Sequence, residues 1–217
     1  MVIALATLLH ILILVYWLGG DLGAFYSSFF LVDPARGVAE RALALKILNA
    51  VDMAPGTALI LALPTGLTLA CATSWLLLPP AALVAVWIGH LVWLALAWVV
   101  HLRHGGGAIV RRADTVIRWA MLALLAVMGG LGAARLVALP LFIALKMLLL
   151  AACIAAGLLV RHQLVPMIPA IRMMLTSGPT PATDVVIADA IARARVVVLA
   201  IWVLVLGAAF LGLWKPQ

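Results

Sequence analysis

The sequence comprises 217 residues, of which 68% are hydrophobic and only 10% are charged, and its mean hydropathy is +1.30. A soluble domain is about half apolar and a quarter charged, so this composition excludes a soluble catalytic domain and predicts that lipid surrounds most of the chain. The net charge of +7 does not indicate nucleic-acid binding, because the basic residues cluster in three connections and not along one face.

Six apolar windows follow one another along the chain. Each is long enough to cross a hydrocarbon core of about 30 Å, so we expect an all-α, polytopic transmembrane bundle with residues 1–217 in a single domain. We expect the first window to remain as a helix and not to be a cleaved signal peptide, because no Lys or Arg precedes it and no small-residue cleavage site follows it. The windows cover residues 2–22, 43–70, 79–102, 115–136, 138–160 and 190–213.

Basic residues predict how the spans are oriented. The connections after the first, third and fifth windows are rich in arginine, whereas the opposite side carries only Arg135 and Lys215. The positive-inside rule then places these connections in the cytoplasm and both termini in the periplasm, if the membrane is a bacterial inner membrane. The basic residues are Arg36, Arg41 and Lys46 in the first connection, Arg103, Arg111, Arg112 and Arg118 in the second, and Arg161, Arg172, Arg193 and Arg195 in the third.

The longest connection, residues 161–189, ends in an amphipathic segment. Thr183 is expected to cap a helix and Asp184 to lie in its first turn. Asp189 precedes Arg193 by one turn, a spacing that favours an ion pair. The last span is therefore predicted to extend into the cytoplasm as a helix at the membrane surface.

Ionisable side chains inside the windows are the candidates for function, because a charge near the middle of a bilayer is costly and usually faces a bundle interior, a ligand or a water path. The candidates are His10 and Asp21 in the first window, Asp52 in the second, His90 and His101 in the third with His104 beside it, and Lys146 in the fifth.

Three of these residues are expected to share one depth. The first, third and fifth windows run in the same direction, and His10, His90 and Lys146 lie about nine, eleven and eight residues into them. At about 1.5 Å per residue, the three lie within about 5 Å of one level and are predicted to meet at one site. Asp21 and His101 then form a second, shallower polar layer on the cytoplasmic side.

Histidines on facing helices suggest a heme b, which takes one or two axial ligands, most often His, in an apolar slot of a helix bundle. We expect His10 to be an axial ligand, and His90 to be the second ligand or a group at the substrate site. The alternative for each histidine is a hydrogen bond between helices without a ligand. Trp17 lies on the His10 face of its helix. Trp87 and Trp93 stand one turn on either side of His90 and are candidates for the walls of a porphyrin or quinone slot, with ordinary aromatic packing as the alternative.

Lys146 requires an anionic partner at its depth: a carboxylate, a heme propionate or an anionic substrate. Asp52 is the candidate carboxylate within the protein. Lys146 and Asp52 are accordingly the residues predicted to act on the substrate.

Two motifs resemble a known superfamily. The run HILILVYWLGG at 10–20 resembles the first-helix pattern H-x6-W-x-G of the membrane superfamily that includes the copper-resistance D proteins and the HemJ-type protoporphyrinogen oxidases, and the run LKMLLLAAC at 145–153 is similar to its Lys-bearing helix. The resemblance implies that His10 and Lys146 are a functional pair associated with heme b and a tetrapyrrole substrate. HemJ-type proteins have fewer spans, and GDLG at 20–23 stands in place of their charged sequence.

These features predict an integral membrane b-type heme protein, an oxidoreductase that transfers electrons or oxidises a membrane-soluble substrate such as a quinone or a tetrapyrrole. Two other classes stay open: a copper-transport permease of the copper-resistance D type, and a non-catalytic subunit of a larger membrane complex. Gly129 and Gly130, each four residues before an alanine, predict close helix packing within the chain or in a homo-oligomer.

Overall fold

The computed structural model describes residues 1–102 and 107–216, which form helices and no strands, and confirms the predicted all-α polytopic bundle. Arg103 and His104 lie outside the described residues. The helices are α1 (Val2–Val32), α2 (Val38–Val51), α3 (Met53–Ala72), α4 (Pro80–Leu102), α5 (Ala108–Ala133), α6 (Leu141–Leu164), α7 (Met167–Ser177) and α8 (Pro181–Trp214).

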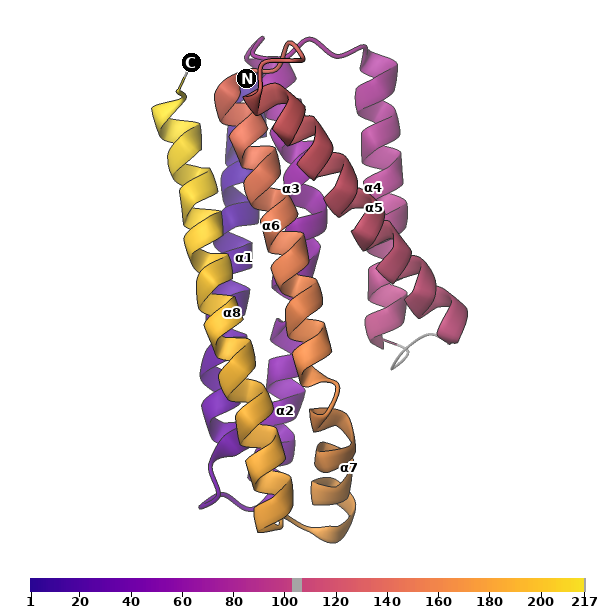
Figure 1. The fold of residues 1–217 in the computed structure, drawn as a ribbon, viewed down its shortest axis with the longest axis vertical. Helices are drawn as coiled ribbons and strands as arrows, with labels where there is room; N and C mark the ends of the chain where they lie inside the picture. The colour runs from indigo at the N-terminus through magenta and orange to yellow at the C-terminus, as the bar shows by residue number, and fades with distance from the viewer. Residues whose placement is uncertain (103–106, 217) are drawn as a thin grey trace.

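Among residues 1–102 and 107–216, six spans are long and apolar enough to cross a membrane, with α2 and α3 counting as one. All six predicted windows therefore correspond to spans, but most spans extend beyond their windows, and three do so by seven residues or more at one end. Helix α1 continues to Val32, α5 begins at Ala108 and α8 begins at Pro181. The windows of α5 and α8 begin after charged residues, and the backbone hydrogen bonding of both helices continues through those residues. Helix α1 instead continues through the uncharged segment 23–32. Both termini lie at the upper end of the molecule in Figure 1, as an even number of spans requires.

The six spans form a ring in which α1 packs on α3, α3 on α4, α4 on α5, α5 on α6, α6 on α8 and α8 on α1. Helices α3 and α6 also touch, and this contact divides the ring into two parts. The first part, the four-helix half, consists of α1, α3, α6 and α8. The second is the α4–α5 hairpin, whose lower end in Figure 1 stands away from the four-helix half.

Glycines allow the helices to approach closely at two interfaces. A Cβ atom at Gly20 of α1 would overlap Ala54 of α3, and a Cβ atom at Gly129 of α5 would lie 2.8 Å from the carbonyl oxygen of Ala144 in α6. Gly132 packs on Ala144 as well, whereas Gly130 has no neighbour there. Close packing within the chain is confirmed, but the contact uses a pair three residues apart and not the predicted pairs four apart.

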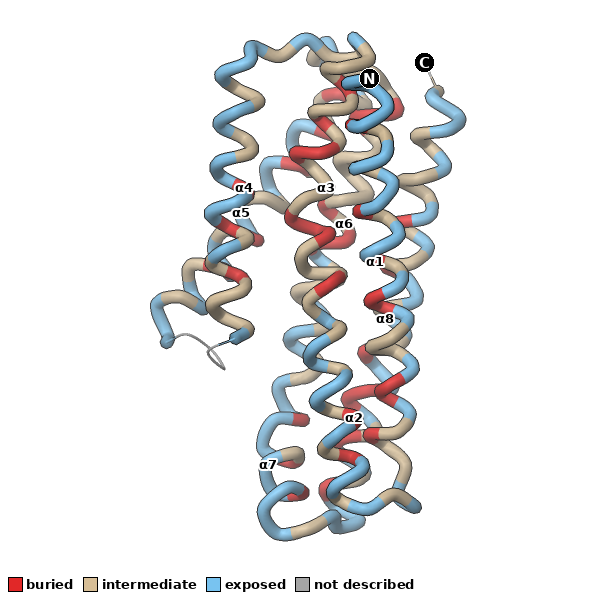
Figure 2. The backbone as a smooth tube through the Cα atoms, turned by 180° about the vertical axis from the view of Figure 1, so that it is seen from behind, coloured by how far each residue is buried: buried red, intermediate tan, exposed pale blue. Residues whose placement is uncertain are grey.

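The lower ends of α1, α2 and α8 form, with α7, a small additional bundle that we call the end bundle. At about 1.5 Å per residue, α1 (31 residues) and α8 (34 residues) are about 46 and 51 Å long, more than a hydrocarbon core of about 30 Å requires. Leu31, Met174 and Ile187 form its core, and Figure 2 shows buried residues gathered there. The predicted extension of the last span is confirmed, and α7 is an addition to the prediction.

A buried arginine holds the end bundle together. Arg41 is fully buried, its Nε donates to the carbonyl of Leu31 at 2.8 Å, and its Nη1 lies 2.7 Å from Asp184 Oδ1. The N-cap of α8 is Thr180, in a capping box with Thr183, so the expectation that Thr183 is the cap was wrong by one turn. No ion pair between Asp189 and Arg193 occurs among the described residues.

Candidate functional site

His10 is fixed against α3 by one edge of its ring. Its Nδ1 lies 3.0 Å from Thr65 Oγ1, and Thr65 itself donates to the carbonyl of Leu61 at 2.7 Å. Because the hydroxyl proton is used on that carbonyl, Thr65 Oγ1 accepts from His10 Nδ1–H. Gly66 makes room for the ring, since a Cβ atom there would lie 3.3 Å from His10 Cε1. This arrangement leaves His10 Nε2 with a free lone pair.

Lys146 lies on α6 within Coulomb range of His10. Its Nζ rests against Gly212 near the end of α8, where a Cβ atom would be 3.0 Å away. The carboxyl end of a helix favours a cation. None of the ion pairs within residues 1–102 and 107–216 includes Lys146. The structure therefore does not pair it with Asp52, which stands at the beginning of the oppositely directed α3.

His90 is buried on α4 and is also held by Nδ1, which donates to the carbonyl of Val86 at 2.8 Å. Its Nε2 is buried and has no partner within the described part of the chain. Trp93 lies beside it, with ring centroids 5.9 Å apart. Trp87 donates from Nε1 to Thr68 Oγ1 at 2.9 Å, which ties α4 to α3.

Helix α3 separates the two histidines. Its Thr65 and Gly66 face α1 and His10, whereas Ile60 and Thr68 face α4. At about 100° per residue these two faces point about 150° apart around α3. The structure thus does not bring His10 and His90 together as two ligands of one iron. Equal depth places residues on one level, but it does not make their helices neighbours.

A small cavity lies in the lower part of the four-helix half, at the level predicted for the shallower polar layer. Its volume is about 70 Å³ and its walls come from α1, the α2–α3 junction, α6 and α8. Asp21, Ser28, Asp52 and Arg195 are its polar lining, and the remaining lining residues are apolar. Trp17 and Trp202 stand beside the Asp21 carboxyl, so Trp17 belongs to this layer.

A closed network around the buried Asp114 lies at the same level, between the α4–α5 hairpin and α6. Asp114 accepts from Trp93 Nε1 at 3.0 Å, from Arg118 Nε at 3.0 Å and from Arg161 Nη1 at 2.9 Å. The Arg118 guanidinium also lies 5.6 Å from the centre of the Trp93 ring. Trp93 and Arg161 thus bind Asp114 from the neighbouring helices α4 and α6, and Arg118 binds it from within α5.

Asp52 lies between these two polar groups. It is exposed at the rim of the cavity, and it is within Coulomb range of Asp21 on one side and of Arg161 and His101 on the other. The predicted second layer of Asp21 and His101 is therefore larger than expected, and Asp52 joins its two parts.

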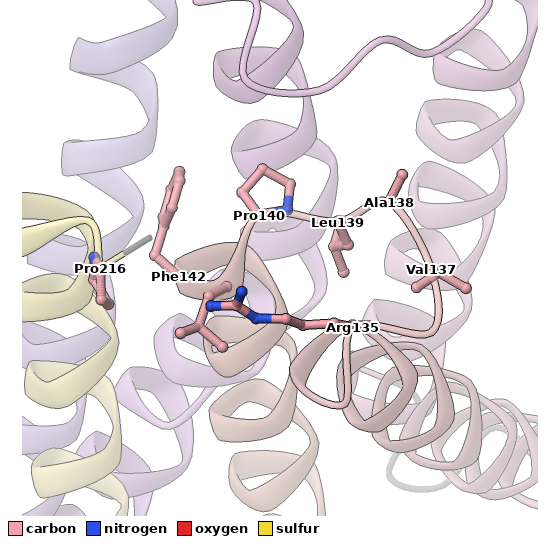
Figure 3. Close-up of a pocket in the computed structure, with 9 residues that line it drawn as sticks. Arg135, Val137, Ala138, Leu139, Pro140, Phe142 and Pro216 are labelled. Atoms are coloured by element: carbon pink, nitrogen blue, oxygen red, sulfur yellow. The ribbon is translucent and has the colours of Figure 1, made fainter.

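A larger hollow of about 450 Å³ lies at the opposite end, around the connection between α5 and α6 (Figure 3). Arg135 is its charged lining residue, and the walls are otherwise apolar or backbone, including Phe142 and Pro216. None of the predicted site residues lines it.

Comparisons with protein-family models, curated proteins and solved structures found no match to this chain. The resemblance to the copper-resistance D and HemJ-type superfamily stays a prediction from its two motifs. Within the described residues, no group of three His, Cys, Asp or Glu side chains lies close enough to hold a metal ion.

Proposed function

We propose that the protein is an integral membrane b-type heme protein that transfers electrons or oxidises a membrane-soluble substrate. His10 would ligate the heme iron, and Lys146 would hold a propionate or a substrate carboxylate. The membrane is a bacterial inner membrane, and the basic connections lie in the cytoplasm.

The proposal rests on the hydrogen bonding of the His10 ring, whose Nδ1–H is bound and whose Nε2 is free to bind a metal. A histidine that ligates a metal usually donates its other ring N–H to an oxygen atom, which fixes the tautomer and aims the lone pair. His10 meets this requirement through Thr65, whose own hydroxyl is anchored on Leu61. His90 meets it through Val86, and its buried Nε2 has no partner among the described residues. His90 is therefore a second, separate candidate ligand.

Because His10 and His90 lie apart, we favour the oxidation of a substrate over electron transfer alone. When bound, heme b would supply one-electron redox chemistry, and His10 would be the one histidine that holds it, because His90 lies on the other side of α3. Lys146 lies within Coulomb range of His10 and is free of ion pairs within the described chain. A carboxylate near His10 would compensate the charge of Lys146, which is costly at that depth. The favoured substrate is accordingly an anionic, lipid-soluble molecule such as a tetrapyrrole, with a quinone as electron acceptor.

The test is a reduced-minus-oxidised spectrum of the protein purified from heme-replete cells. We expect a b-type band in the wild type and in His162→Ala, whose side chain is exposed on α6. His10→Ala should lose most of the band. A wild type without a b-type band, or an unchanged band in His10→Ala, would contradict the proposal.

A further inference from the structure

The cavity around Asp21 has no role in the proposed heme site. It lies about eleven residues along α1 from His10, or about 16 Å at 1.5 Å per residue. A cavity of about 70 Å³ has room for a few water molecules or one small, partly hydrated ion.

Asp21 is the innermost charged group of this cavity. It is only 7% exposed, and it forms no ion pair within the described part of the chain. The carboxyl lies beside the indoles of Trp17 and Trp202. Burying an ionised carboxylate without a counter-charge is costly, so it binds a cation or becomes protonated.

The cation nearest in the cavity is already engaged elsewhere. Arg195 donates from Nε to Ser28 Oγ at 3.0 Å, and its guanidinium lies 3.7 Å from the centre of the Phe29 ring. Its Nη2 is buried without a hydrogen-bond partner among the described residues, and it does not reach Asp21. Arg195 therefore does not act as the counter-charge of the Asp21 carboxylate.

The other titratable groups around Asp21 come from the remaining walls. Asp52 faces it from the α2–α3 junction and Cys153 from α6, both within Coulomb range. Arg161 of α6 interacts with Asp52 but is bound to Asp114. A second carboxylate at the rim strengthens the attraction for a cation inside. Calcium takes six to eight oxygen ligands and magnesium keeps several water molecules, more than this small cavity provides. Its two carboxylates and the Arg195 guanidinium together carry a net charge of −1 when all three are ionised, which suits a single positive charge.

We propose that the cavity between α1, the α2–α3 junction, α6 and α8 is a binding site for a monovalent cation, with Asp21 as its main ligand and Asp52 at its entrance. The cation is a proton or a sodium ion. The site is independent of heme, because none of its residues belongs to the proposed heme site.

Two measurements on the purified full chain distinguish the two cations. Equilibrium binding of radioactive Na⁺, with choline chloride as the ionic-strength control, measures the metal ion. The infrared band of protonated carboxylic acids, recorded without Na⁺, measures the proton. We expect saturable Na⁺ binding or a protonated carboxyl band in the wild type, and loss of that signal in Asp21→Asn. Asp189→Asn, which removes an exposed carboxylate from α8, should keep it.

Asp52→Asn provides a second variant in case Asp21→Asn does not fold. Because Asp52 is exposed, this change is expected to leave the fold intact and to weaken Na⁺ binding about tenfold or to change the carboxyl band. The proposal is overturned if the wild type shows neither Na⁺ binding nor a protonated carboxyl band. It is also overturned if Asp21→Asn gives the same signal as the wild type. If Asp21→Asn does not fold, an unchanged signal in Asp52→Asn overturns it instead.

Discussion

The four-helix half and the α4–α5 hairpin both carry ionisable side chains at membrane depth, but these side chains differ in whether they have ion-pair partners. In the hairpin, Asp114 binds Trp93 and Arg118 and also Arg161 of α6, so the charges of this network have partners. In the four-helix half, Asp21 and Lys146 have no ion pair within the described chain. Charges that satisfy one another hold helices together, whereas charges without a protein partner are available for a ligand.

The largest effect is expected when the closed network of the hairpin is opened. Asp114→Ala leaves Arg118 buried without its carboxylate and Trp93 Nε1 without an acceptor. We expect the free energy of unfolding to fall by about 3–5 kcal/mol, as for other broken buried ion pairs. Thermal unfolding in detergent measures this change. If Asp114→Ala is no less stable than Asp189→Ala, the network does not fasten the hairpin.

A moderate effect is expected where the helices of the four-helix half approach most closely. Gly20→Val places a side chain against Ala54, and the two helices must move apart, at a cost of about 1–3 kcal/mol. Gly19→Val is the matched control, because a Cβ atom at Gly19 meets no atom within 4 Å. Equal melting temperatures for the two variants would show that the packing of α1 on α3 differs from the one described.

The two arginines on Asp114 should differ in importance. The side chain of Arg161 is 51% exposed, whereas that of Arg118 is 7% exposed. Exposed ion pairs contribute at most about 1 kcal/mol, so Arg161→Gln is expected to cost less than that and Arg118→Gln clearly more. Comparing the two melting curves checks the order, and the reverse order would place Arg161 and not Arg118 at the centre of the network.

The smallest effect on stability is expected at the His10 anchor. Thr65→Val keeps the shape of the side chain but removes the acceptor for His10 Nδ1–H, at about 1 kcal/mol. The proposed ligand then loses its fixed tautomer, so the b-type band should weaken or shift. Thr68→Val, on the α4 face of the same helix, is the control. A shifted band in Thr68→Val alone would assign the ligand to the α4 side.

Hydropathy was sufficient to predict the six spans, because lipid contact requires long apolar helices whatever their neighbours are. Depth was sufficient to place His10 and Lys146 on one level, and Asp21 in a lower layer. Lateral neighbours were not predictable from depth, and so His90 was expected opposite His10 although α3 lies between them.

The hairpin network was missed for a related reason. Arg118 and Arg161 were counted as signals of orientation because they stand near the ends of the apolar windows, and Asp114 fell one residue outside its window. The spacing of Asp114 and Arg118, four residues apart in one helix, is the signal that predicts their pairing. Similarly, Thr180 followed by proline at the first helical position is a stronger cap signal than Thr183.

The heme-to-protein ratio of the wild type and of His10→Ala, purified in parallel, measures whether His10 holds a heme. We expect a stoichiometric amount of heme b in the wild type and little or none in the variant, while both proteins melt at similar temperatures. Equal heme content in the two proteins, or no heme in the wild type, would contradict it.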